Sequence, residues 1–154
     1  MRRALELAAE AMADEEVPVG CVVVRDGRIV GQGRNRRQKS RSAVAHAEIE
    51  AIEQACSKLG GWRLWQCELY VTLEPCPMCA GAIVNARIPR LYFSTKDPKA
   101  GACGSVFDLF SLPLNHKPAA HEGLLADESA ELLRTFFRSL RDSQRLKRVD
   151  CDNT

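Results

Sequence analysis

The segment LEPCPMCAGA, residues 73–82, places two cysteines three positions apart where an expected strand passes into an expected helix. The residues ELYVTL at 68–73 have the composition of a strand. Pro77 suits the first position of a helix, because that position needs no N–H donor, and we expect a helix from about Pro77 to Asn85. A strand that leads directly into a helix favours an α/β fold.

The same alternation continues along the chain. Apolar residues recur at helical spacing in three further segments, which predicts helices over residues 3–13, 46–59 and 127–147. Four more strands are expected, over residues 19–24, 28–33, 90–94 and, weakly, 117–124. The Asp26-Gly27 pair predicts a two-residue hairpin turn between the first two strands. The remaining segments are expected to be a basic loop at 34–43 and a short helix at 105–111.

Strands that alternate with helices predict α/β layers around a single sheet. A length of 154 residues suits one domain with one core, which we assign to residues 1–148, followed by a short tail over 149–154. No apolar run approaches the roughly eighteen residues of a membrane span. The first residues lack a long apolar core and include Glu6 and Glu10, which argues against a signal or transit peptide and favours a cytoplasmic protein.

Seven cysteines are spread along the chain without the density of a secreted disulfide scaffold. In a reducing compartment, a close pair such as Cys76 and Cys79 more often does redox chemistry or binds a metal. The pair alone is compatible with a redox centre, half of a structural zinc site or part of a catalytic metal site. The segment His46-Ala47-Glu48, thirty residues before Cys76, favours the third interpretation.

His46 and the two cysteines are each expected at the start of a helix. The partial positive charge of a helix N-terminus lowers the pKa of a thiol, and the i, i+3 spacing brings both sulfurs to one side. Two thiolates and one imidazole give zinc three protein ligands and leave a fourth position open, which is the pattern of a catalytic site. The sequence therefore predicts a zinc ion held by His46, Cys76 and Cys79.

Glu48 adds a carboxylate beside this predicted site. Positions i and i+2 point about 200° apart on a helix, so His46 and Glu48 share a metal site only if that site lies beyond the helix end. A carboxylate that lies beside the metal without binding it suits general acid/base chemistry. We therefore expect Glu48 to carry protons.

Basic residues gather in two segments, although the net charge is only +2. One segment is the run at residues 34–41. The other is a stripe on the last expected helix, formed by Arg134, Arg138, Arg141, Arg145 and Arg148. Either a solvated face or an anionic partner accounts for such patches. The adjacent Phe136 and Phe137 are expected in the core, with the alternative that one of the two lies near an anionic partner.

The ordered pattern His-x-Glu followed by Pro-Cys-x-x-Cys is typical of zinc-dependent deaminases. More specific segments are EVPVGCVVV at 16–24, LYVTLEPCPMCAGAIVNARI at 69–88, DPKAGACGS at 97–105 and LLRTFFRSLR at 132–141. On these residues the chain resembles the bacterial tRNA-specific adenosine deaminases of the cytidine deaminase-like superfamily. The resemblance implies a three-layer α/β/α fold around a central mixed five-stranded sheet. It also implies a homodimer, with one zinc ion per subunit.

The resemblance implies conversion of adenosine to inosine at the wobble position of a tRNA anticodon, with the anticodon stem-loop as partner. The predicted zinc ligands match those of the family, and Glu48 matches its proton carrier. Positions that match substrate-contacting groups are Asn35, Ala47, Asp97 and Lys99. Beside an RNA-acting site, Arg138 and Arg141 become candidates for phosphate contacts.

Two other functions stay open. A deaminase of free guanine, cytosine or a nucleoside would share the zinc ligands and Glu48 but would not need a basic last helix. A non-catalytic, zinc-stabilised RNA-binding subunit would have no use for Glu48, because a structural site needs no unligated acid.

Overall fold

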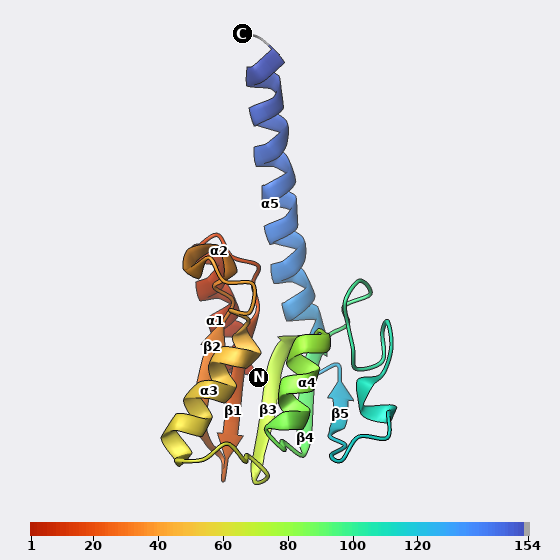
Figure 1. Cartoon of the computed structure of the whole chain (residues 1–154). Helices are drawn as coiled ribbons and strands as arrows, with labels where there is room; N and C mark the ends of the chain where they lie inside the picture. The colour runs from red at the N-terminus through yellow and green to blue at the C-terminus, as the bar shows by residue number, and fades with distance from the viewer. Residues whose placement is uncertain (153–154) are drawn as a thin grey trace.

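Five strands form one mixed sheet in the order β2-β1-β3-β4-β5 (Figure 1). The computed structural model describes the backbone of residues 1–152 and the side chains of residues 1–145. The strands are β1 (Gly20–Arg25), β2 (Arg28–Arg34), β3 (Cys67–Leu73), β4 (Arg90–Thr95) and β5 (Ala119–Glu122). Strand β1 is antiparallel to β2 and β3, whereas β3, β4 and β5 are parallel to one another. The five predicted strands are confirmed.

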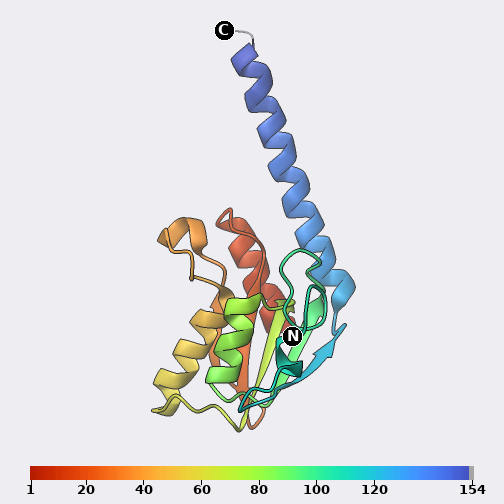
Figure 2. The same cartoon turned by 45° about the vertical axis from the view of Figure 1, so that its right-hand side comes forward.

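Helices cover both faces of the sheet, as the predicted three-layer α/β/α arrangement requires (Figures 1 and 2). They are α1 (Arg2–Ala13), α2 (Arg37–Ser40), α3 (Ala47–Leu59), α4 (Pro77–Asn85), the 3₁₀ turn η1 (Leu109–Ser111) and α5 (Ala126–Asp152). Helices α3 and α4 lie side by side on one face, and α1 and the start of α5 pack on the other. Inward-facing side chains such as Val23, Leu69 and Phe93 form the core with Ile83 of α4.

The turn between β1 and β2 has the predicted form. Asp26 and Gly27 both adopt positive φ, 51° and 71°. Two consecutive left-handed residues make a type I′ turn, whose twist matches that of the strands it joins. The hairpin leads β2 back along β1 toward Asn35, which follows its last residue.

Three local expectations need correction. The segment 34–43 is not entirely loop, because it contains the four-residue helix α2, none of whose side chains is buried. The helix expected over 105–111 is only the turn η1, where the Asp108 carboxylate accepts the Phe110 N–H at 3.0 Å. Helix α5 continues past residue 147 to Asp152, through part of the segment assigned to a tail. The side chain of Arg148 lies outside the described residues.

Helix α5 starts on the body of the protein and then projects away from it (Figures 1 and 2). Its first turns are anchored by Ser129, a buried residue whose hydroxyl donates to the carbonyl of Thr72 on β3. Further along, Phe137 and Leu140 are 42% and 43% exposed. Among the described helices, none combines the length and the apolar content that crossing a membrane requires.

Helix α3 approaches the sheet closely at Gly33 of β2. A Cβ atom at this position would lie 2.3 Å from the carbonyl oxygen of Ala47 and 2.8 Å from the backbone nitrogen of Ala51. Any side chain would therefore push the helix away from the strand. Glycine at this position sets the height of the first turn of α3 above the sheet.

Candidate active site

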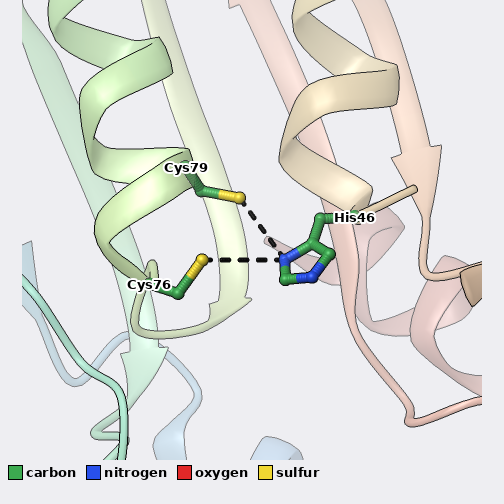
Figure 3. A group of neighbouring side chains, drawn as sticks. All are labelled: His46, Cys76 and Cys79. Atoms are coloured by element: carbon green, nitrogen blue, oxygen red, sulfur yellow. Dashed lines mark hydrogen bonds between the residues drawn. The ribbon is translucent and has the colours of Figure 1, made fainter. Parts of the chain in front are cut away.

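Three potential metal ligands meet at the starts of α3 and α4 (Figure 3). His46 is the N-cap of α3, and Cys76 is the N-cap of α4 with Pro77 as the first residue of that helix. The Nδ1 of His46 lies 3.7 Å from Sγ of Cys76 and 3.5 Å from Sγ of Cys79. All three donor atoms lie within 4.8 Å of one another, so this group, the metal cluster, could hold a metal ion.

The spacing and chemistry of the metal cluster fit zinc. With usual bond lengths, a nitrogen and a sulfur on one tetrahedral zinc lie about 3.6 Å apart. A hydrogen bond from Cys79, together with one from His46, lowers the pKa of Cys76 to about 4. The hydrogen bond to Cys76, together with burial, raises the pKa of Cys79, and the bond between His46 and Cys76 raises the pKa of His46. The side chains of His46, Cys76 and Cys79 thus share protons through hydrogen bonds, and a metal cation can take the place of these protons.

Glu48 is a buried acid beside the metal cluster. It is the second residue of α3, and it is only 4% exposed. Burial raises the pKa of its carboxyl group to about 7, although a hydrogen bond from its own backbone N–H and the charge of His46 act in the opposite direction. A carboxyl group with such a pKa can accept and release a proton near neutral pH.

Asn35 is held by a second buried acid, Glu16. The side-chain nitrogen of Asn35 donates to Oε2 of Glu16 at 3.4 Å, and Oε1 of Glu16 accepts the backbone N–H of Lys39 at 2.8 Å. Both Asn35 and Glu16 are buried, at 6% and 1% exposure. Because the amide nitrogen faces Glu16, the carbonyl oxygen of Asn35 faces the other way and can accept a hydrogen bond from a ligand.

A cavity of about 820 Å³ adjoins the metal cluster and Glu48. Its walls come from the end of β2, the start of α3, the loop after β4 and one side of α5. The residues predicted to contact substrate all border it: Asn35, Ala47, Asp97, Lys99, Arg138 and Arg141. Segments far apart in the sequence therefore contribute to a single cavity.

Six cations border this cavity: Arg37, Lys96, Lys99, Arg134, Arg138 and Arg141. Lys96 pairs with Glu122 at 3.1 Å, and Arg134 pairs with Glu131 at 2.8 Å. Within residues 1–145, no ion pair neutralises the other four, which we call the cationic border. An uncompensated group of cations around a cavity attracts a polyanion.

Several residues at the cavity escape sequence reasoning. The core placement predicted for Phe137 is wrong, because this residue is exposed and borders the cavity. Arg37 belongs to the basic run at 34–41, and that run is the only sequence signal for it. Glu16 and Glu74 form no local pattern, because their partners lie far along the chain.

The known proteins to which this chain is similar are deaminases, which agrees with a metal cluster beside a buried acid. Residues 1–141 match the MafB19-like deaminase family. A tRNA-specific adenosine deaminase of Agrobacterium fabrum is 49% identical over 142 residues, which cover 92% of this chain and 93% of that protein.

Two solved structures share the five-stranded, cytidine deaminase-like architecture. One, from a study of A-to-I editing by tRNA:A34 deaminases at the wobble position, has a TM-score of 0.84 at 48% identity and covers 86% of this chain and 97% of that chain. A guanine deaminase from Nitrosomonas europaea has a TM-score of 0.74 at 30% identity and covers 88% of this chain and 81% of that chain. Residues 1–141 match the family model, and the relative at 49% identity and the structure at 48% identity cover most of the chain. The protein therefore belongs to the tRNA-specific adenosine deaminases, within the MafB19-like deaminase family.

Proposed function

We propose that this protein converts adenosine to inosine at the wobble position of a tRNA anticodon, with a zinc ion held by His46, Cys76 and Cys79. The observation that carries the proposal is the joint arrangement of the metal cluster, the buried acid Glu48 and a cavity with a cationic border. Membership of the family supports this activity, because a relative at 49% identity is named a tRNA-specific adenosine deaminase and a solved structure at 48% identity comes from a study of A-to-I editing at the wobble position.

The proposed reaction replaces an amino group by an oxygen atom. When bound, zinc lowers the pKa of water and so supplies a nucleophile near neutral pH. Glu48 accepts a proton from the attacking water and donates a proton to N1 of adenine. The C6–O bond forms first. The second proton of the attacking water then passes through Glu48 to the amino group, the exocyclic C6–N bond breaks, and ammonia leaves. Burial raises the pKa of the Glu48 carboxyl group toward neutral pH, which favours a group that both accepts and donates a proton.

Asn35 and the backbone of Ala47 orient the base. The carbonyl oxygen of Asn35 accepts a hydrogen bond from the nucleotide, because Glu16 engages the amide nitrogen. Ala47 is the first residue of α3, where a backbone N–H has no partner inside the helix and can donate to the base. One fixed acceptor and one fixed donor favour a single orientation of the bound nucleotide.

The cationic border favours RNA over a free base. The guanine deaminase of Nitrosomonas europaea shares the fold, so the architecture alone does not separate the two substrate classes. Arg37 comes from α2, and Arg138 and Arg141 come from α5, so cations reach the cavity from two separate elements. A nucleotide inserted from a polynucleotide has phosphates on both sides for these cations, whereas a free base has none.

Asp97 offers a means to recognise ribose. Its Oδ1 accepts the backbone N–H groups of Lys99 at 2.9 Å and Ala100 at 3.2 Å. The other oxygen, Oδ2, is then available to accept a hydrogen bond from a 2′-hydroxyl. This hydroxyl distinguishes RNA from DNA.

The test compares substrates with one preparation of zinc-loaded protein. We expect inosine, measured by mass spectrometry of digested RNA, in an anticodon stem-loop with adenosine at the wobble position. A stem-loop with guanosine at that position is the matched control. Ammonia release from free guanine, cytosine and adenosine is measured in parallel, and turnover of the free compounds alone would overturn the proposal.

The proposal extends to assembly and location. We expect a cytoplasmic homodimer with one zinc ion per subunit, and residues 1–148 as its deaminase domain. The family resemblance supports the dimer. Light scattering measures the number of subunits, and zinc analysis of the same sample measures the number of zinc ions per subunit. A monomer at micromolar concentration would contradict the expected homodimer.

A further inference from the structure

Glu74 is a buried acid that the chemistry described above does not use. It follows β3 directly, two residues before Cys76, and it is 2% exposed. Its carboxylate faces residues 97–105, which we call the 97–105 loop. This loop follows β4 and carries Asp97 and Lys99 to the cavity.

The loop donates four hydrogen bonds to Glu74. Oε1 accepts the backbone N–H groups of Cys103 at 2.9 Å and Ser105 at 3.0 Å. Oε2 accepts the backbone N–H of Asp97 at 3.0 Å and the hydroxyl of Ser105. A carboxylate has about four acceptor sites, so both oxygens are fully engaged inside the protein.

We propose that Glu74 is a positioning residue for RNA recognition, which fixes the 97–105 loop so that Asp97 and Lys99 face the substrate. This inference rests on the function proposed above. Although Glu74 borders the cavity, all four acceptor sites of its carboxylate are occupied by the loop, so none is left for the RNA or the metal and Glu74 acts through the loop.

The hydrogen bonds link the anchor directly to the RNA-facing group. Glu74 holds the backbone N–H of Asp97, and the Asp97 carboxylate in turn holds the N–H groups of Lys99 and Ala100. The far end of the loop returns to the same anchor through Cys103 and Ser105. One carboxylate therefore closes the loop at both ends and sets the direction of Asp97.

Gly101 allows this close approach. A Cβ atom at this position would lie 2.4 Å from the carboxyl carbon and from Oε2 of Glu74, and 2.6 Å from the carbonyl oxygen of Asp97. The Gly101 N–H also donates to that carbonyl at 2.9 Å. The loop folds around Glu74 without space for a side chain at residue 101.

The first test is Glu74→Gln, with Glu53→Gln on an exposed part of α3 as the matched control. Glutamine has the same shape but presents an NH₂ group, which cannot accept, to one set of donors. We expect KM for the anticodon stem-loop to rise about tenfold while kcat changes less than about threefold, because the loss concerns RNA binding. Hydrogen exchange of the amides of Asp97, Cys103 and Ser105 should accelerate, with zinc content unchanged.

Gly101→Ala disturbs the same contact from the loop side and leaves the carboxylate intact. We expect the same rise in KM and the same acceleration of hydrogen exchange. This variant keeps the test decisive if Glu74→Gln folds poorly.

A double-mutant cycle with Asp97→Asn tests whether Glu74 acts through Asp97. We expect the double variant to have a KM close to that of the weaker-binding single variant, because coupled residues give non-additive effects. Additive effects would overturn the proposal, as would zinc loss from Glu74→Gln or wild-type KM and hydrogen exchange in that variant. If wild-type protein does not act on the stem-loop, the proposed function fails, and the hydrogen-exchange result still shows whether Glu74 holds the loop.

Discussion

The metal cluster and the cationic border belong to one cavity but rest on different parts of the molecule. His46 and Cys76 cap helices that pack on the sheet, and Cys79 is completely buried. Arg138 and Arg141 are exposed residues of α5, the helix that projects from the body of the protein (Figure 1). The comparison teaches that tertiary packing fixes the metal cluster, whereas the cationic border consists of surface charge. The two regions should therefore fail in different ways.

The largest effect should come from Cys79→Ala. Removing a thiolate from a three-ligand site leaves too few donors to retain the metal, and we expect deamination to fall below detection. Metal analysis after dialysis measures the loss directly. The matched control is Cys56→Ala on α3, which removes a thiol outside the metal cluster. Full zinc occupancy in the Cys79 variant would remove this residue from the ligand set.

Glu48→Ala should separate chemistry from metal binding in the same region. We expect kcat to fall roughly 10²–10⁴-fold, the usual contribution of a general acid/base, while zinc remains bound. Single-turnover inosine formation and metal analysis are the two measurements. Glu53→Ala, on the same helix but exposed, should behave like wild type. Unchanged kcat in the Glu48 variant would exclude Glu48 as the general acid/base, whereas the non-catalytic RNA-binding alternative predicts no inosine even from the wild-type protein.

The double substitution Arg138→Ala with Arg141→Ala probes the cationic border. We expect stem-loop binding to weaken about tenfold at low salt, and the slope of log K against log salt to fall by about 0.7 per lost phosphate contact. Filter binding over a salt series gives both values, and zinc content should not change. Arg63→Ala is the control, because Arg63 stacks on Trp62 and does not border the cavity. A slope that stays at the wild-type value would identify the stripe as a solvated face.

The smallest effect should come from Glu16→Gln, which changes the acid that holds Asn35 at the cavity. Glutamine cannot accept both the Asn35 amide and the Lys39 N–H, so Asn35 loses its fixed orientation. We expect kcat/KM to fall about fivefold, the value of roughly one hydrogen bond. The neighbouring, exposed Glu15→Gln is the control. Equal kcat/KM in the two variants would show that Asn35 needs no support from Glu16.

Sequence reasoning succeeded where local patterns decide the structure. The start of α4 at Pro77 follows from proline chemistry, and the hairpin turn at Asp26-Gly27 follows from the positive φ that glycine accepts. The convergence of His46 with the two cysteines follows from placing all three at helix starts. The first two features depend on only a few neighbouring residues. The third joins residues 30 and 33 positions apart, and it could be expected because two helix starts can face each other beside one edge of a sheet.

The features that the sequence did not predict are those whose structure depends on residues far away along the chain. Periodicity placed Phe137 on an apolar face, but it could not reveal that this side chain stays 42% exposed. Helix α5, which carries it, projects from the body of the protein (Figure 2). The short helix α2 has no buried side chain and therefore no apolar pattern to detect. Glu74 lies 31 residues from Ser105, and only the folded chain brings the two together.

Gly33 has a consequence for the thermodynamics of metal uptake. The close contact between β2 and the first turn of α3 places the backbone next to His46 through packing of the protein itself. A metal ion that enters such a preorganised site need not order the chain, in contrast to a zinc finger, where binding and folding are one event. Less of the binding free energy would then be spent on ordering the chain, so Gly33, which has no side chain to offer as a ligand, would influence how tightly a metal is held.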